Sequence, residues 1–145
     1  MNSIKIEDRD YALWLLLTRT HYRIKQARAV EVRPFNLTPE QCGALFYIYS
    51  KGGDATQSQI SSWMLRKPQT ISANIEGMVK KGLLKKKRDL KRRNVIHLSL
   101  TTKGQEAYEV SMERKSIKKI VSVLTEEKRN NLIEALSELL KASTP

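Results

Sequence analysis

The sequence predicts a mainly α-helical protein with one small β-hairpin, and three observations carry this expectation. Apolar residues recur at three- and four-residue intervals over most of the 145 residues, which is the spacing of amphipathic helices. Threonines that can cap a helix precede several of these segments. Residues 83–100 depart from the helical spacing, because a strongly charged stretch there separates two short apolar segments. A chain of this length forms one ordinary domain with its own core.

Charge and cysteine content narrow the class of protein. Lys and Arg number 27 against 15 Asp and Glu, and the formal net charge of +12 favours a polyanion as partner: nucleic acid first, an anionic membrane surface second. The single cysteine, Cys42, excludes a disulfide within the chain and a cysteine zinc cluster, and it fits a reducing cytoplasm. Residues 1–10 do not resemble a signal peptide, and no apolar run is long enough to span a bilayer. We therefore expect a cytoplasmic protein without a membrane segment.

Two helices are expected in the first third of the chain. Residues 11–32 contain no Pro or Gly and form a long helix, which Pro34 ends. The second helix begins after Thr38, because Pro39 suits the first helical position and Gln41 completes a capping box. It stops at the pair of glycines at residues 52 and 53.

Two shorter helices follow. Thr56 and Gln59 form a second capping box at the start of the third helix, which a Lys-Pro pair at residues 67 and 68 ends. The fourth helix covers about residues 69–81 and is followed by Gly82 as a helix stop. Its buried face is set by four apolar residues at helical spacing: Ile71, Ile75, Met78 and Val79.

The rest of the chain predicts a hairpin and then more helix. We expect two strands around a long charged tip, with the second strand at residues 95–100. A fifth helix starts after Thr101 or Thr102. Thr125 caps a sixth helix, whose first turn carries two glutamates where the helix dipole favours them.

Two short helices with a tight break, followed by a hairpin, is the element order of a winged helix-turn-helix. In that arrangement the second helix of the pair enters the major groove of DNA. On the face of residues 69–81 opposite the apolar stripe, or flanking it, lie candidate base or phosphate contacts: Gln69, Thr70, Ser72, Ala73 and Lys80.

The hairpin, or wing, is the second indication of DNA binding. Between Lys80 and Arg93 there are nine basic residues and one acid, Asp89. The alternative is a solvated run of charge, but this run lies where a wing follows the phosphate backbone. An arginine at the tip can also enter a narrow minor groove. The candidate contacts in the wing are Lys87, Arg88, Lys91, Arg92 and Arg93.

Six motifs in this order resemble the MarR (multiple antibiotic resistance regulator) family over about residues 11–142. They are Leu37-Thr38-Pro39-Glu40-Gln41, Thr56-Gln57-Ser58-Gln59-Ile60-Ser61, Thr70-Ile71-Ser72-Ala73, Gly82-Leu83-Leu84, Asp89 to Arg93, and Leu100-Thr101-Thr102-Lys103-Gly104. The resemblance implies a single domain over 1–145. Within it, about residues 38–100 form the DNA-binding lobe, and residues 11–33 and 105–142 form dimerisation helices.

The resemblance also implies a function: a homodimeric repressor of transcription that binds a palindromic site and is released by a small-molecule effector. Two departures bear on readout, because Ala73 stands where the family often has an arginine, and the wing is more basic than usual. Asp89 matches the first aspartate of the family's wing and is expected to brace it by pairing with Arg93 or a neighbour.

Other residues are assigned no site. Cys42 is expected to fill the core, with oxidant sensing as the alternative. His21 and Tyr22 are expected at a helix surface or interface, with an effector cleft as the alternative. His97 is placed on the second strand of the wing. We expect no metal site, no cofactor and no enzymatic activity, because no ligand cluster, phosphate loop or nucleophile with a matched base is present.

Three alternatives to a specific regulator remain open. A non-specific or architectural DNA-binding protein fits the basic wing and Ala73. An interaction module would use its basic surface to bind an acidic protein or a membrane. An enzyme is the most distant alternative.

Overall fold

The computed structural model describes residues 5–145, which fall into two compact units. The winged-helix unit covers residues 28–113, and the terminal-helix unit covers the described residues 5–27 together with residues 114–145. Helix α1 (Arg9–Val32) contributes to both units. The remaining elements are a short 3₁₀ helix (Arg33–Phe35), α2 (Pro39–Ser50), β1 (Asp54–Thr56), α3 (Gln57–Met64), α4 (Pro68–Lys80), β2 (Leu84–Arg88), β3 (Ile96–Leu100), α5 (Thr102–Ser111), α6 (Lys115–Val121) and α7 (Glu126–Ala142).

Threonine caps start four of the helices where the sequence predicts them. The side chain of Thr38 accepts a hydrogen bond from the Gln41 amide, and the Gln41 side chain in turn accepts one from the Thr38 amide. Thr56 and Gln59 form the same reciprocal pair at α3. Thr101, rather than Thr102, caps α5, and Thr125 caps α7. These bonds satisfy amides that the first turn of a helix leaves without partners.

The core of the winged-helix unit lies where α2, α3 and α4 meet the sheet. Leu45 and Ile48 of α2, Ile60 of α3 and Leu98 of β3 are fully buried there. From α4, Ile71, Ile75 and Met78 are buried, while Val79 packs against this core only partly buried. The apolar stripe predicted for residues 69–81 is therefore the face by which α4 is held.

The sheet has three strands rather than the expected two. β2 and β3 form the predicted antiparallel hairpin, with Lys87 opposite His97, and β1 pairs with the other edge of β3. We did not predict β1, because three residues are too few to show an alternating pattern. A turn through Gly52 and Gly53, both at positive φ, brings β1 beside β3.

Gly104 is required by a close approach between α5 and the start of the hairpin. A Cβ atom at this position would overlap the backbone carbonyl of Leu83. That carbonyl oxygen accepts a hydrogen bond from the Thr101 amide at 3.1 Å, and the Thr101 hydroxyl donates to the Gly82 carbonyl oxygen. Gly82 itself has a φ of +75° and ends the turn after α4.

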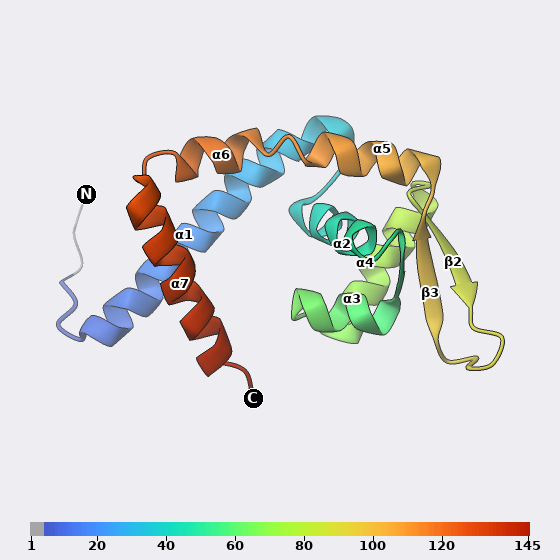
Figure 1. Ribbon diagram of the computed structural model, residues 1–145, viewed down its shortest axis with the longest axis horizontal. Helices are drawn as coiled ribbons and strands as arrows, with labels where there is room; N and C mark the ends of the chain where they lie inside the picture. Colours follow the sequence, from blue (N-terminus) through green and yellow to red (C-terminus); the bar gives the residue numbers. More distant parts are fainter. Residues whose placement is uncertain (1–4) are drawn as a thin grey trace. The chain divides into compact units, whose positions relative to one another are not determined.

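The helical segment expected from Thr101 to Thr125 is divided into α5 and α6. Arg114 has left-handed backbone torsion angles, and this residue separates the two helices. Figure 1 shows α5 beside α2. The rings of Tyr49 and Tyr108 stack between these two helices, with their centroids 3.9 Å apart. Arg28, at the C-terminal part of α1, donates a hydrogen bond of 2.6 Å to the Ser111 carbonyl at the end of α5.

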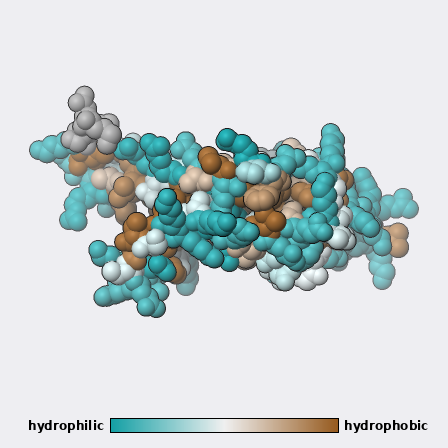
Figure 2. Space-filling view, turned by 90° about the horizontal axis from the view of Figure 1, so that it is seen from above, coloured by the Kyte–Doolittle hydropathy of each residue, from teal (hydrophilic) through white to brown (hydrophobic). Residues whose placement is uncertain are grey.

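The terminal-helix unit exposes many large apolar side chains. Figure 2 shows apolar residues, in brown, at the surface of this unit among hydrophilic ones. No residue of α7 is buried, although its leucines recur at helical spacing. Among the described helices, none is both long and apolar enough to cross a membrane. The large exposed apolar residues of α1 and α7 include Leu13, Trp14, Leu16, Leu132, Ile133, Leu136, Leu139 and Leu140.

Candidate nucleic-acid interface

Helix α4 presents most of the predicted contact residues on the face opposite its buried stripe. Gln69, Thr70, Ala73 and Lys80 are exposed, and Ser72 is half-buried at the edge of that face. Pro68 takes the first position of the helix, one residue earlier than expected. The polar N-terminal turn of α4 is thus accessible from outside the molecule.

Contacts from neighbouring elements hold α4 in place. Glu40 of α2 accepts hydrogen bonds from the Arg66 guanidinium at 3.2 Å and from the Asn74 amide at 3.3 Å. Lys81 donates to the Asn36 carbonyl at 2.7 Å and to the Gln41 side chain at 3.0 Å. The middle of α4 and the residues that flank the helix are therefore bonded to residues 36–41, at the start of α2.

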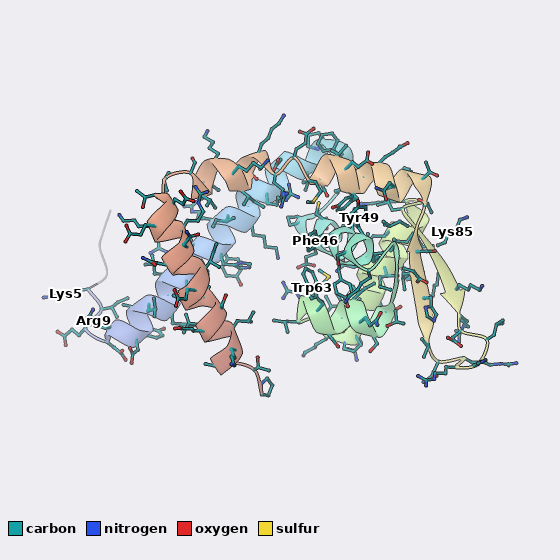
Figure 3. All side chains as sticks on the ribbon, in the orientation of Figure 1. Lys5, Arg9, Phe46, Tyr49, Trp63 and Lys85 are labelled. Atoms are coloured by element: carbon teal, nitrogen blue, oxygen red, sulfur yellow. The ribbon has the colours of Figure 1, made fainter. Side chains whose placement is uncertain are left out.

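Helix α3 is fixed to α2 by aromatic packing. The ring of Trp63 stacks on Tyr47 with centroids 5.1 Å apart and lies 5.8 Å from Phe46. Figure 3 shows Phe46 and Trp63 on the side of these helices that faces away from the hairpin. The turn between α3 and α4, with Leu65 at a φ of +55°, follows directly.

An ion pair joins the wing to α4. Lys86 of β2 lies 2.6 Å from the Glu76 carboxylate, and this contact holds the pKa of Glu76 below its ordinary value. Alternate residues of β2 point to the other face, and Lys85 extends away from the helices in Figure 3. The Glu76 carboxylate therefore offsets the charge of Lys86, whereas Lys85 is exposed on the other face of the strand.

Five further cationic residues lie at the end of β2 and at the tip of the wing. Lys87, Arg88, Lys91, Arg92 and Arg93 are all exposed. Arg88 donates a hydrogen bond to the Arg93 carbonyl at 3.0 Å across the tip. Within residues 5–145, no carboxylate lies within ion-pair distance of the side chains of Lys91, Arg92 or Arg93.

The Asp89 carboxylate accepts hydrogen bonds from backbone amides of the wing tip, and it also contacts a histidine of β3. One carboxylate oxygen accepts from the amides of Lys91 at 2.8 Å and Arg92 at 3.0 Å, and the bonds from Arg92 and Lys91 hold the pKa of Asp89 below its ordinary value. The other oxygen lies 3.1 Å from Nε2 of His97. The contacts of Asp89 therefore go to neighbours of Arg93 and to His97, rather than to the Arg93 side chain.

His97, Glu76 and Glu40 contribute to the site without having been assigned to it from the sequence. The sequence correctly placed His97 on the second wing strand. Because His97 and Asp89 lie on opposite sides of the hairpin tip, pairing the two strands from the tip would have indicated their contact. No comparable signal pointed to Glu40, because its partners lie 26 and 34 residues away in the chain.

The residues left without a site lie in two different settings. Cys42 is buried in the core, where desolvation raises the pKa of its thiol, and this disfavours the reactive thiolate. His21 and Tyr22 are exposed neighbours on α1, with ring centroids 5.7 Å apart. No group of three or more potential metal ligands occurs in the described part of the chain.

A family model and the solved structures both show similarity to the MarR family. Residues 35–93 match the family model of the MarR family. No curated protein matches the chain by sequence. Among solved structures, an organohalide-sensing transcriptional regulator in its 2,4-dichlorophenol-bound form superposes with a TM-score of 0.89 and 23% identity, covering 99% of this chain and 86% of its own.

Two further structures share the fold. AbsC, a MarR family transcriptional regulator from Streptomyces coelicolor, has a TM-score of 0.84 at 17% identity, with 97% of each chain covered. The MepR–DNA complex of S. aureus has a TM-score of 0.81 at 25% identity, with 90% of this chain and 96% of that chain covered. The matched family model extends from the start of α2 to the tip of the wing, and the shared fold extends over nearly the whole chain. Residues 35–93 are therefore similar to the MarR family, and the chain shares its fold with these solved structures.

Proposed function

We propose that the protein is a cytoplasmic, non-enzymatic regulator of transcription that binds duplex DNA in a sequence-specific manner as a homodimer and represses from a palindromic operator. One observation carries the proposal. The exposed polar turn of α4 and the cationic wing belong to the same compact unit and are linked by the Glu76–Lys86 ion pair.

Helix α4 supplies the sequence readout in this proposal. The major groove of B-DNA is wide enough to admit a helix, and its base edges differ in their hydrogen-bonding groups. Gln69, Thr70 and Ser72 offer short polar groups at the N-terminal turn, and Ala73 offers a methyl group. Lys80, at the other end of the helix, is suited to a phosphate.

The wing supplies affinity. Lys87, Arg88, Lys91, Arg92 and Arg93 neutralise backbone phosphates, and each neutralised phosphate releases counterions. An arginine from the tip enters the minor groove where the groove is narrow and its negative potential is strongest. Asp89 braces the tip that carries these residues.

A second copy of the chain covers the apolar surface of the terminal helices. Trp14 is 60% exposed and Ile133 is 58% exposed, which is costly for side chains of this size in water. Two-fold symmetry then places two α4 helices on half-sites about 10 base pairs apart. The segments assigned to dimerisation are residues 11–33 and 105–142.

A small-molecule effector that releases the repressor is part of the proposal. Support comes from the organohalide-sensing neighbour, whose structure was solved with 2,4-dichlorophenol. DNA as partner is supported by the MepR–DNA complex. An architectural, non-specific DNA-binding protein is the second candidate, favoured by Ala73 and by the high charge of the wing.

Selection from a pool of random duplexes at ~150 mM salt tests the proposal. We expect the wild-type protein to enrich a palindrome whose half-sites lie about one helical turn apart. Replacing Gln69 and Thr70 with alanine should relax the enriched sequence. Replacing Lys91, Arg92 and Arg93 with glutamine should weaken binding while preserving that sequence. Enrichment of no common sequence would favour the architectural role and reject specific regulation.

A further inference from the structure

His97 lies on the outer face of the wing, between two carboxylates. Its Nε2 atom is 3.1 Å from Oδ2 of Asp89 at the tip, and its Nδ1 atom is 3.8 Å from Oδ1 of Asp54 on β1. Lys87 is its cross-strand partner on β2, and Thr56 is its partner on β1. The side chain is 35% exposed, so it belongs to the surface of the sheet rather than to the core.

The contact with Asp89 is directional. An ionised carboxylate only accepts hydrogen bonds, so the imidazole Nε2–H donates to it. Hydrogen bonds to a charged acceptor are stronger than neutral ones. The 3.8 Å between Nδ1 of His97 and Oδ1 of Asp54 is too long for a hydrogen bond.

Asp89 divides its two oxygens between the tip and the sheet. Oδ1 accepts from the backbone amides of Lys91 and Arg92, while Oδ2 contacts His97. The Asp89 amide donates to the Val95 carbonyl, and the Val95 amide donates to the Arg92 carbonyl. The tip is therefore a closed turn, and the Asp89 side chain anchors it to β3.

We propose that His97 is a positioning residue of the DNA-binding wing, which acts through Asp89 to fix the direction in which the tip presents Arg92 and Arg93. This inference rests on the proposed DNA binding. A tip that is ordered before binding loses less conformational freedom when its arginines engage DNA. His97 itself need not touch DNA for this effect.

The test compares two substitutions at position 97 with a control on the same strand face. His97→Val removes the donor while preserving β-propensity, and His97→Gln retains an amide that can donate to Asp89. Ser99→Val is the control, because Ser99 lies two residues further along β3 and pairs with Asp54 and Lys85, away from the tip. Duplex affinity is measured by anisotropy, and thermal unfolding reports the integrity of the fold.

We expect His97→Val to weaken duplex binding about 3- to 10-fold, less than the full effect of one hydrogen bond to a charged group, because His97 acts on DNA only through the tip. His97→Gln should restore affinity to within about twofold of the wild type. Ser99→Val should bind as the wild type does. All three variants should unfold within a few degrees of the wild type, because no core contact is removed.

A double-mutant cycle separates positioning from a general structural role. When Arg92 and Arg93 are both glutamine, the further change His97→Val should cost little, since the residues that His97 positions are gone. An additive loss in that background would overturn the inference. So would equal affinity of His97→Val and the wild type, or a His97→Gln variant as weak as His97→Val, and these results would leave the proposed function intact. Failure of the wild type to bind any duplex would overturn both.

Discussion

Replacing Lys91, Arg92 and Arg93 with glutamine should reduce the salt dependence of DNA binding by an amount that the wing geometry sets. These three side chains are exposed and have no carboxylate partner among residues 5–145, so each is available to a phosphate. Lys86 is not counted, because Glu76 lies 2.6 Å from it and neutralises it. The slope of log affinity against log salt falls by about 0.9 for each phosphate that is no longer neutralised, which is about 2.7 per subunit.

The effect doubles in a dimer that uses both wings, to a slope change of about 5. Raising the salt from about 50 to 200 mM should therefore weaken the wild type about a thousandfold more than the triple variant. Anisotropy titrations at four or five salt concentrations give both slopes.

A matched control removes the same charge elsewhere. Lys118, Lys119 and Lys128 are residues of the terminal-helix unit, and their replacement with glutamine lowers the formal net charge of +12 by the same three units. The slope of this control should stay within about 1 of the wild type. Equal slopes for the wild type and the wing variant would refute the assignment of the wing to the phosphate backbone.

Three further measurements probe the fold, its ionised groups and its assembly. Gly104→Ala should destabilise the protein by about 1–3 kcal/mol in urea unfolding, because the added Cβ overlaps the Leu83 carbonyl. The control Gly77→Ala, whose Cβ has room, should be neutral or stabilising, and equal effects of the two variants would contradict this packing. The pKa of Asp89 lies below its ordinary value, so its bonds in the wing stabilise the fold at pH values above the pKa that Asp89 has in the unfolded chain, and this stability is lost as pH falls through the lower folded-state pKa. An NMR titration of the Arg92 amide should show a midpoint below the value for an aspartate in an unstructured peptide, and a midpoint at that value would reject the bonds. Replacing Leu136 and Leu139 of α7 with glutamate should convert a dimer of twice 16.7 kDa into a monomer in light scattering, and a dimer that persists would reject α7 as part of the interface.

Local signals made much of the winged-helix unit predictable. Capping boxes at Thr38 and Thr56 are encoded within four residues of sequence, and the structure forms both. The apolar stripe of residues 69–81 also indicated which face of α4 is buried, because helical spacing leaves little freedom once the stripe is continuous. The hairpin followed from the change in spacing and from its charged tip.

Features that depend on long-range contacts were not predictable in the same way. β1 exists because β3 is there to pair with it, and three residues carry no pattern of their own. The break at Arg114 lies in a segment without Pro or Gly, where spacing alone favours a continuous helix. In the candidate site, the basic residues could be identified from the sequence, but the bond of Asp89 to His97 and that of Glu76 to Lys86 depend on the register of the folded hairpin.

Binding to a specific duplex tests the central claim most directly. The purified protein is titrated by fluorescence anisotropy with a duplex from the region upstream of its own gene, and with a scrambled duplex of the same composition, at ~150 mM salt. The account predicts that the upstream duplex binds at least about a thousandfold more tightly than the scrambled one. Equal affinity for the two duplexes, or binding to neither, would contradict a sequence-specific regulator.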